Sequence, residues 1–286
     1  MFVITGATGH TGAVAADTLL AQGERVRVVV RERGKAERFA AKGAEVAVAD
    51  MADADALTKA LTGARGAYLL VPPNMAVADF RAYQREVSDA IVEAVTRAKV
   101  PHVVLLSSIG AQLASGNGPI AALHDLEDRL EAIPSLATTS IRAASFMENL
   151  GGSLTMLGQG LVTSFHPADF AYERIATADI GKLAAAELRE GGKSSIIELG
   201  SDPISANDIA AVLTKLVGQP IKVAEAPLDA VVPTFMGFGM PQQLAELYRE
   251  MLAGFGSRHI GFEGGHRRIR GTTELATVLA GLLGKG

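Results

Sequence analysis

The chain has 286 residues, of which 48% are hydrophobic and 20% are charged, and its formal net charge at pH 7 is −4. This length allows one large domain or a domain with an appended lobe, and the apolar fraction excludes a disordered chain. The slightly acidic balance does not suggest a nucleic-acid surface, so we expect no nucleic-acid partner. The absence of cysteine excludes disulfides, thiolate catalysis and cysteine-based metal sites, and it fits a cytoplasmic location without requiring one.

The sequence predicts no segment that is inserted into a membrane. Gly6 and Gly9 interrupt the apolar N-terminus before it reaches the length of a signal-peptide core. The best candidate for a membrane span, residues 149–168, has no Asp, Glu, Lys or Arg, but it contains Pro167, four glycines and several polar side chains. Its hydrophobicity is too low for a transmembrane helix, so we expect a soluble protein.

Strand-like apolar runs alternate with helical patterns through the first half of the chain. The runs occupy residues 2–5, 25–30, 45–50, 66–71, 102–108 and 137–143, and another occupies 194–200. Helical patterns occupy residues 11–21, 35–41, 53–61, 78–99 and 118–133. Because most of the runs are almost continuously apolar, they are typical of strands buried on both faces of a parallel sheet. The predicted fold class is therefore α/β, a doubly wound parallel sheet of the Rossmann type.

The second half of the chain predicts a smaller, mostly helical lobe. We expect residues 1–150 to form a nucleotide-binding Rossmann domain and residues 151–286 a substrate lobe, with 176–202 returning a helix and a strand to the sheet domain. Ser205, followed by Asp208 and an apolar stripe, predicts a capped helix start. Residues 221–227 predict a short strand, and the sequence after them predicts mostly helix.

Three glycines in the opening "MFVITGATGHTG" predict a phosphate-binding loop. Gly6, Gly9 and Gly12 follow the first strand and lead into a helix, whose unpaired N–H groups and positive dipole end suit a pyrophosphate. The spacing differs from the usual G-x-G-x-x-G fingerprint, and a merely structural turn is the alternative. The strand before, the helix after and the further βα units favour nucleotide binding. The loop residues expected at the cofactor are Gly6, Thr8, Gly9, His10, Thr11 and Gly12.

The end of the second strand favours NADP over NAD. Arg31 stands nineteen positions after Gly12, where NAD-binding proteins usually have an acidic residue and an arginine accommodates the 2′-phosphate of NADP. Lys35 adds a second positive charge nearby, whereas Glu32 leaves NAD open and a solvated loop is the alternative. Further residues expected at the cofactor are Asp50 and Met51 after the third strand, and Leu70, Val71 and Pro72 after the fourth.

Five motifs together resemble the NmrA-like group of atypical short-chain dehydrogenases/reductases. They are "TGATGHTG", "VVVR", "LLSSIGAQ", "RAASFMENL" and "ATADIG". The resemblance implies an NADP(H)-binding Rossmann domain with a small substrate lobe. It implies relatives that reduce quinones, triphenylmethane dyes or isoflavone-type compounds, and one transcriptional regulator that binds the dinucleotide without evident turnover. It also implies that Phe146 contacts the nicotinamide ring, with core packing as the alternative.

The chain departs from the parent superfamily in its proton donor. None of its four tyrosines has the lysine four residues later that the superfamily's Tyr-x-x-x-Lys pair requires. In the helix where that pair is expected, we predict His124 as the proton donor, oriented by Glu127 one turn later. A surface histidine is the alternative. Ser107, at the end of the fifth strand, is predicted to orient the substrate, unless it only ends the strand.

The remaining histidines do not predict a metal site, because His259 and His266 with one Glu in a glycine-rich segment are a poor ligand set. The basic stretch at 266–270 is interpreted as a solvated loop. The sequence thus predicts an NADPH-dependent oxidoreductase that transfers hydride to a small electron-poor acceptor such as a quinone, held against Phe146 and residues 225–256. An NADP(H)-sensing regulator without turnover is the alternative, and the sequence leaves open whether the protein is a monomer or a homodimer.

Overall fold

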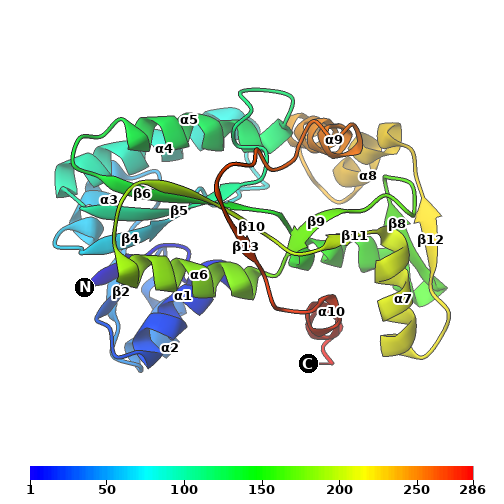
Figure 1. Ribbon diagram of the computed structural model, residues 1–286, viewed down its shortest axis with the longest axis horizontal. Coiled ribbons are helices and arrows are strands. Elements are labelled where there is room, and N and C mark those ends of the chain that lie inside the picture. Colours follow the sequence, from blue (N-terminus) through cyan, green and yellow to red (C-terminus); the bar gives the residue numbers. More distant parts are fainter. Residues whose placement is uncertain (286) are drawn as a thin grey trace.

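The computed structural model describes residues 1–285, and its centre is an eight-stranded parallel sheet (Figure 1). The strand order is β13-β10-β6-β5-β4-β1-β2-β3. The strands are β1 (Phe2–Ile4), β2 (Val26–Val30), β3 (Glu45–Val48), β4 (Gly66–Leu69), β5 (His102–Ser108), β6 (Ala137–Ala143), β10 (Ser195–Gly200) and β13 (Arg267–Arg270). The order reverses between β1 and β4, which is where a Rossmann sheet binds its ligand at the carboxyl ends of the strands. The predicted fold class is confirmed.

Helices cover both faces of this sheet, as Figure 1 shows. The helices on one face are α1 (His10–Ala21), η1 (Arg33–Ala36), α2 (Glu37–Ala40) and α6 (Thr177–Glu190), and those on the other are α3 (Ala54–Leu61), α4 (Phe80–Ala98) and α5 (Ala121–Glu131). Alternate residues of β5 serve the two cores: Val104 packs with the α1 and α6 side, and Val103 and Leu105 pack with the α4 and α5 side. Because successive residues of a strand face opposite cores and both cores are apolar, the strand sequences are almost continuously apolar.

A smaller lobe follows β6 and packs beyond the carboxyl edge of the sheet. Its elements are β7 (Ser145–Phe146), η3 (Met147–Gln159), β8 (Leu161–Ser164), β9 (Tyr172–Ile175), β11 (Pro203–Ile204), α7 (Ala206–Val217), β12 (Lys222–Glu225), η4 (Leu228–Ala230), α8 (Val231–Gly237), α9 (Gln242–Gly256) and α10 (Leu275–Leu282), with η2 (Gly118–Ile120) facing it. The predicted capping box at Ser205 and Asp208 is present. The small sheets β11-β9-β7 and β12-β8 include four strands that the sequence did not reveal, because each is only two to four residues long.

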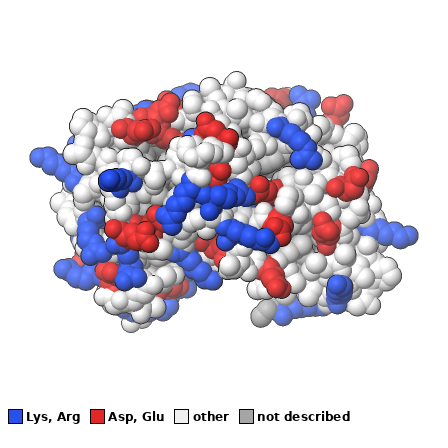
Figure 2. Space-filling model, in the orientation of Figure 1, with Lys and Arg blue, Asp and Glu red and all other residues white. Residues whose placement is uncertain are grey.

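The basic stretch at 266–270 corrects the sequence interpretation, because residues 267–270 form the edge strand β13 and not a solvated loop. Arg267 forms an ion pair with Glu187 at 2.8 Å, and Arg268 pairs with Glu173. Figure 2 shows blue and red side chains side by side at the centre of the visible face, where Figure 1 places this strand. Because three of its four residues are arginine, the strand has no apolar pattern that would predict it. Charged side chains are common on edge strands, where they prevent pairing with other chains.

Candidate functional site

The glycine loop connects β1 to α1 directly beside the point where the strand order reverses. Gly9 is the N-cap residue of α1, with an extended backbone (φ −97°), and no side chain caps the helix. The first turn of α1 has no acidic residue. Its N–H groups and dipole are therefore left for an external anion, as a pyrophosphate site requires.

The three glycines have different structural roles. A Cβ on Gly12 would clash with the backbone carbonyl oxygens of Thr5, at 2.5 Å, and Gly6, so Gly12 permits α1 to pack on the loop. Gly6 has a φ of +60°, and a Cβ there would lie 2.7 Å from the Leu70 side chain. A Cβ on Gly9 would meet only the Gly6 carbonyl oxygen, at 3.4 Å. The packing of the fold therefore requires glycine at positions 6 and 12. At position 9 the missing side chain leaves open space, which a ligand can occupy.

A buried hydrogen bond joins α1 to β4 behind this loop. The Tyr68 hydroxyl donates to Thr11 Oγ1 at 3.0 Å, and burial raises the Tyr68 pKa far above its usual range. Tyr68 is completely buried, so its hydroxyl is out of reach of a substrate. Thr11 is buried, whereas Thr8 and His10 are exposed on the open side of the loop. Of the predicted loop residues, Thr8, Gly9 and His10 face outward and Thr11 and Gly12 support the loop from within.

Arg31 presents an unpaired positive charge where the 2′-phosphate of NADP is expected. It follows β2, is exposed, and forms no side-chain hydrogen bond or ion pair with residues 1–285. Burial and the Asp50 carboxylate raise the pKa of the Tyr83 hydroxyl, and the Arg31 charge offsets only part of this rise. Tyr83, Asp50 and Arg31 are therefore close enough to interact electrostatically. Lys35 instead binds Glu32 at 2.8 Å, which also lowers the Glu32 pKa. The free Arg31 guanidinium suits a phosphate, whereas Lys35 is engaged by Glu32, and both contacts with the cofactor stay predictions.

The other predicted cofactor residues lie at the carboxyl ends of β3 and β4. Asp50 is exposed and accepts a hydrogen bond from the Ala52 backbone N–H at 2.9 Å. Met51 is buried in the core below it. Leu70, Val71 and Pro72 are half-buried immediately after β4. These positions, together with Gly9 and Arg31, lie at or just after the carboxyl ends of the strands, where a Rossmann sheet binds its dinucleotide, and their contact with NADP(H) stays a prediction.

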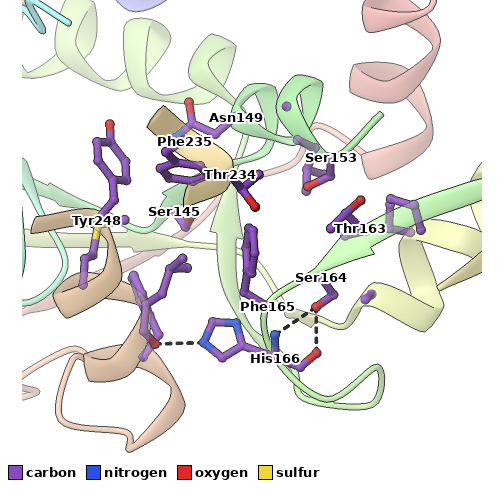
Figure 3. A pocket seen from close by; sticks show the side chains of 18 of the residues that line it. Ser145, Asn149, Ser153, Thr163, Ser164, Phe165, His166, Thr234, Phe235 and Tyr248 are labelled. Atoms are coloured by element: carbon purple, nitrogen blue, oxygen red, sulfur yellow. Dashed lines mark hydrogen bonds between the residues drawn. The ribbon is translucent and has the colours of Figure 1, made fainter. Parts of the chain in front are cut away.

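A cavity of about 430 Å³ lies between this edge and the lobe (Figure 3). Its lining includes Met75, from the segment that follows β4, together with Ser145 of β7 and Asn149 of η3. Phe165 and Phe235 face each other edge to face, with ring centroids 5.9 Å apart, and Phe235 meets Tyr248 in the same way at 5.5 Å. The remaining aromatic lining residues are His166, Phe170, Tyr172, Phe238 and Phe255. Its size and aromatic walls suit a small planar ligand.

His166 is fixed as a neutral side chain in the wall of this cavity. Its Nε2 lies 2.8 Å from the Leu252 carbonyl oxygen, and its ring stacks on Phe170 with centroids 5.0 Å apart. Burial lowers its pKa, the Leu252 carbonyl raises it and the Arg174 charge lowers it, with a net lowering. The carbonyl contact assigns the proton to Nε2 and leaves Nδ1 as an acceptor. Figure 3 shows the Leu252 contact and the turn formed by Ser164.

The predicted partnership between Glu127 and His124 is wrong. Glu127 is buried and binds Arg142, whose NH2 lies 2.7 Å from Glu127 Oε2. His124 Nδ1 lies 2.9 Å from the Ala111 carbonyl oxygen, and its Nε2 is 3.8 Å from Asp128 on the next turn. The charge on Arg142 explains the difference, because a buried guanidinium binds a carboxylate more strongly than a half-exposed imidazole does. His124 as proton donor stays a prediction.

Ser107 and Phe146 are not brought to the aromatic cavity. The Ser107 hydroxyl is buried and has no hydrogen-bond partner among residues 1–285. Strand alternation from Leu105 turns Ser107 toward α4 and α5, and its predicted contact with substrate stays a prediction. Phe146 is half-buried and packs against the core on the α1 and α6 side. Of the apolar set expected from 225–256, Phe235, Phe238, Met240 and Met251 do line the cavity, whereas Met236 is 45% exposed outside it.

Comparison with known families gives a match to the model of the NmrA-like family over residues 1–258. The chain belongs to the NmrA-like family. Two curated relatives are the NAD(P)H azoreductase of Xenophilus azovorans and quinone oxidoreductase 2 of Escherichia coli K12. The first is 25% identical over 267 residues, covering 88% of this chain and 86% of the relative. The second is 27% identical over 255 residues, covering 86% and 85%.

Solved structures of NmrA-like reductases share this fold. The E. coli NADPH-dependent quinone oxidoreductase complexed with NADPH has a TM-score of 0.82 at 24% identity, covering 99% of this chain and all of the other. The triphenylmethane reductase of Citrobacter sp. has a TM-score of 0.81 at 19% identity, covering 99% of each chain. Both the sheet domain and the lobe therefore belong to the shared architecture.

Two further observations bear on other classes of function. Among residues 1–285, no helix combines the length and the apolar character that a membrane crossing needs. The same residues contain no group of three or more His, Asp or Glu side chains that could hold a metal ion.

Sequence reasoning missed the residues of the cavity wall between 165 and 174. Phe165 and His166 lie within residues 149–168, which the sequence marks only as a candidate membrane span. Tyr172 enters the sequence argument only because it lacks a lysine four residues later. The signal is present in "FHPADFAYER", where three aromatic residues, one histidine and one arginine fall within ten positions. Such a density in a predicted substrate lobe favours a ligand site over a surface loop.

Proposed function

We propose that this chain is an NADPH-dependent oxidoreductase that transfers a hydride to a small electron-poor acceptor such as a quinone. The observation that carries the proposal is the aromatic cavity, whose lining includes Met75 from the segment that follows β4 at the carboxyl edge of the sheet. A cofactor across that edge and an acceptor in the cavity would be neighbours. The azoreductase and quinone oxidoreductase among its relatives support this reading.

When bound, NADPH supplies a hydride, which together with one proton reduces a quinone to a hydroquinone and leaves NADP⁺. The chain's own part is to orient and to exclude water. Phe165, Phe235 and Tyr248 form walls that hold a planar ring, and holding two reactants in the right geometry is worth about 7–11 kcal/mol in favourable cases. Because a quinone delocalises the charge it receives, the missing Tyr-x-x-x-Lys pair costs less with this substrate class than with a simple ketone.

The proton donor is proposed to be His124, as the sequence predicts. Its Nδ1 contact with the Ala111 carbonyl fixes the tautomer and leaves Nε2, beside Asp128, to exchange a proton. His124 is outside the lining of the aromatic cavity.

The test follows NADPH absorbance with a panel of quinones and dyes, while the affinities for NADP⁺ and NADPH are measured separately. We expect turnover with at least one quinone. Phe235→Ala should raise the KM for that quinone about tenfold or more, whereas Met236→Ala, its exposed neighbour outside the cavity, should leave KM unchanged. Binding that differs between the two redox forms without any turnover would contradict the enzyme and favour a sensor.

A further inference from the structure

Arg174 brings a full positive charge into the wall of an otherwise aromatic cavity. It is 8% exposed, and it comes from β9, where it stands level with Ser145 of β7. The other lining residues are apolar, aromatic, hydroxyl or amide side chains, apart from the neutral His166. Arg174 is thus the only permanent charge among the described residues that line this space.

No carboxylate of residues 1–285 lies within ion-pair distance of the Arg174 guanidinium. The two acidic groups nearest in sequence and strand order are engaged elsewhere, Glu173 with Arg268 and Asp202 with Arg270. Arg174 Nε is buried and lacks a hydrogen-bond partner within the described chain. This situation is unusual, because a buried charge without a carboxylate partner is destabilising.

The contacts that Arg174 does make prepare it for an anion. Its NH2 donates to the Tyr172 hydroxyl oxygen at 2.7 Å, and its Cζ lies 4.4 Å from the centroid of the Tyr172 ring. These contacts fix the guanidinium against the aromatic wall. Because the Tyr172 oxygen accepts from Arg174, its own O–H remains available to donate. Tyr172 also lines the cavity, so the two side chains offer neighbouring donors to one ligand group.

We propose that the acceptor reduced by this protein is a planar conjugated molecule that carries a fixed anionic group, a carboxylate or a sulfonate, and that Arg174 and Tyr172 bind this group. The proposal rests on the proposed function and names the substrate class of the same site. A fixed anion fits better than the reacting oxygen of a neutral quinone. The buried charge is present before any hydride has moved, and a carboxylate would neutralise it throughout the cycle.

The kinetic test uses a matched pair of acceptors, a 1,4-naphthoquinone with a propionate side chain and its methyl ester. The saturated side chain keeps the reduction chemistry of the two rings alike, so the charge is the main difference. With the wild-type protein we expect the acid to have a KM at least tenfold lower than the ester. Arg174→Gln should raise the KM of the acid by tenfold or more, leave the KM of the ester within about twofold, and leave kcat nearly unchanged for both.

The matched control is Arg258→Gln. Arg258 is exposed, and its Cζ lies 5.1 Å from the centroid of Phe170, so it is close to the same wall but outside the cavity lining. Arg258→Gln removes the same charge without changing the cavity lining, so this substitution should not alter the preference for the acid. Arg174→Lys should recover part of the preference, because it restores the charge without the planar fork. The melting temperature of the Gln variant should not fall, since no ion pair is broken and an uncompensated buried charge is removed, and its NADPH affinity should stay near wild type.

A binding measurement separates this proposal from the proposed function. Calorimetry on the NADP⁺-loaded protein with naphthalene propionate and its methyl ester, neither of which accepts hydride, measures the anion preference without turnover. If the wild type reduces neither quinone but prefers the acid by tenfold and loses that preference in Arg174→Gln, the enzyme proposal fails and the anion site stands. If acid and ester bind and react alike in the wild type, the anion site is overturned. An equal loss of kcat with both quinones in Arg174→Gln would also overturn it and would assign Arg174 to the developing oxyanion.

Discussion

Glu127 and Arg142 form a buried ion pair across α5 and β6, with Arg142 NH2 2.7 Å from Glu127 Oε2 and both side chains less than 10% exposed. Burial alone would lower the Arg142 pKa, but the bonds to Glu127 and to Glu263 raise it above its ordinary value. Glu263 is half-exposed and contacts the other side of the guanidinium at 2.7 Å. Glu127 is therefore the buried one of the two carboxylates that neutralise Arg142, and its role is in folding.

We expect Glu127→Gln to lower the free energy of unfolding by about 3 kcal/mol, because breaking a buried pair leaves one partner charged and incompletely compensated. Urea denaturation measures this change. Asp125→Asn, on the same helix, is the control. It removes an exposed pair with Arg129 and should change the free energy of unfolding by about 0.5 kcal/mol or less. Equal effects of the two substitutions would show that Arg142 does not depend on Glu127.

Arg31→Asp should weaken NADPH binding by about 10²-fold and NADH binding only slightly. The substitution removes the free guanidinium from the position predicted to face the 2′-phosphate, and the new carboxylate would repel that phosphate. Lys35→Gln is the control, because Lys35 is occupied by Glu32, and it should weaken NADPH binding much less. Dissociation constants for both cofactors measure the ratio. An equal loss of NADPH and NADH affinity would contradict the assignment of the 2′-phosphate to Arg31.

Gly9→Val and Gly12→Ala should fail in different ways. The backbone at Gly9 is extended and its Cβ position is nearly open, so the valine variant should fold and lose both cofactors. The Cβ of an alanine at Gly12 would clash with the Thr5 and Gly6 carbonyls, so this variant should lower the melting temperature. Circular dichroism with titration calorimetry separates the two losses. Normal cofactor affinity in a folded Gly9→Val variant would reduce the loop to a turn.

The stability of the protein should fall as the pH is lowered from 7.5 to 5.5. Burial lowers the pKa of His166 and of His102 below the ordinary value of 6.5, so the unfolded chain binds more protons in this range. The stabilisation from keeping each imidazole neutral is present above pH 6.5 and is lost as the pH falls toward the folded-state pKa, at up to about 1.4 kcal/mol per pH unit. Denaturation of wild type, His166→Gln and His102→Gln at both pH values measures this. An unchanged slope in both variants would contradict it.

The sequence predicted the sheet and the cofactor loop better than the substrate site, for a physical reason. Strands buried on both faces and a glycine loop between a strand and a helix are local patterns, and β1, Gly9 and Arg31 occupy the expected places. The partners of Glu127 and the exposure of Ser107 depend on which strands become neighbours, which periodicity does not reveal. The cavity combines residues of β8, β9, α8 and α9, and its lining residues in β8 and α9 are more than 80 positions apart in the sequence. Its composition therefore follows only from the folded structure.

His124→Ala tests the proton donor, and the size of its effect should depend on the acceptor. If His124 Nε2 delivers the proton, turnover should fall by about 10²-fold with an acceptor whose reduced form is strongly basic, which is the usual scale of general acid catalysis. The loss should be clearly smaller with a quinone, because its reduced anion is delocalised and needs the proton less urgently. Cofactor affinity should stay near wild type, and Asp128→Asn, which removes only an exposed neighbour 3.8 Å away, should have a small effect. Steady-state rates with the two acceptors give the comparison. Unchanged rates with both acceptors would mean that solvent supplies the proton and that His124 is a surface residue held by the Ala111 carbonyl, while the roles proposed for Gly9, Arg31 and the aromatic cavity would be unaffected.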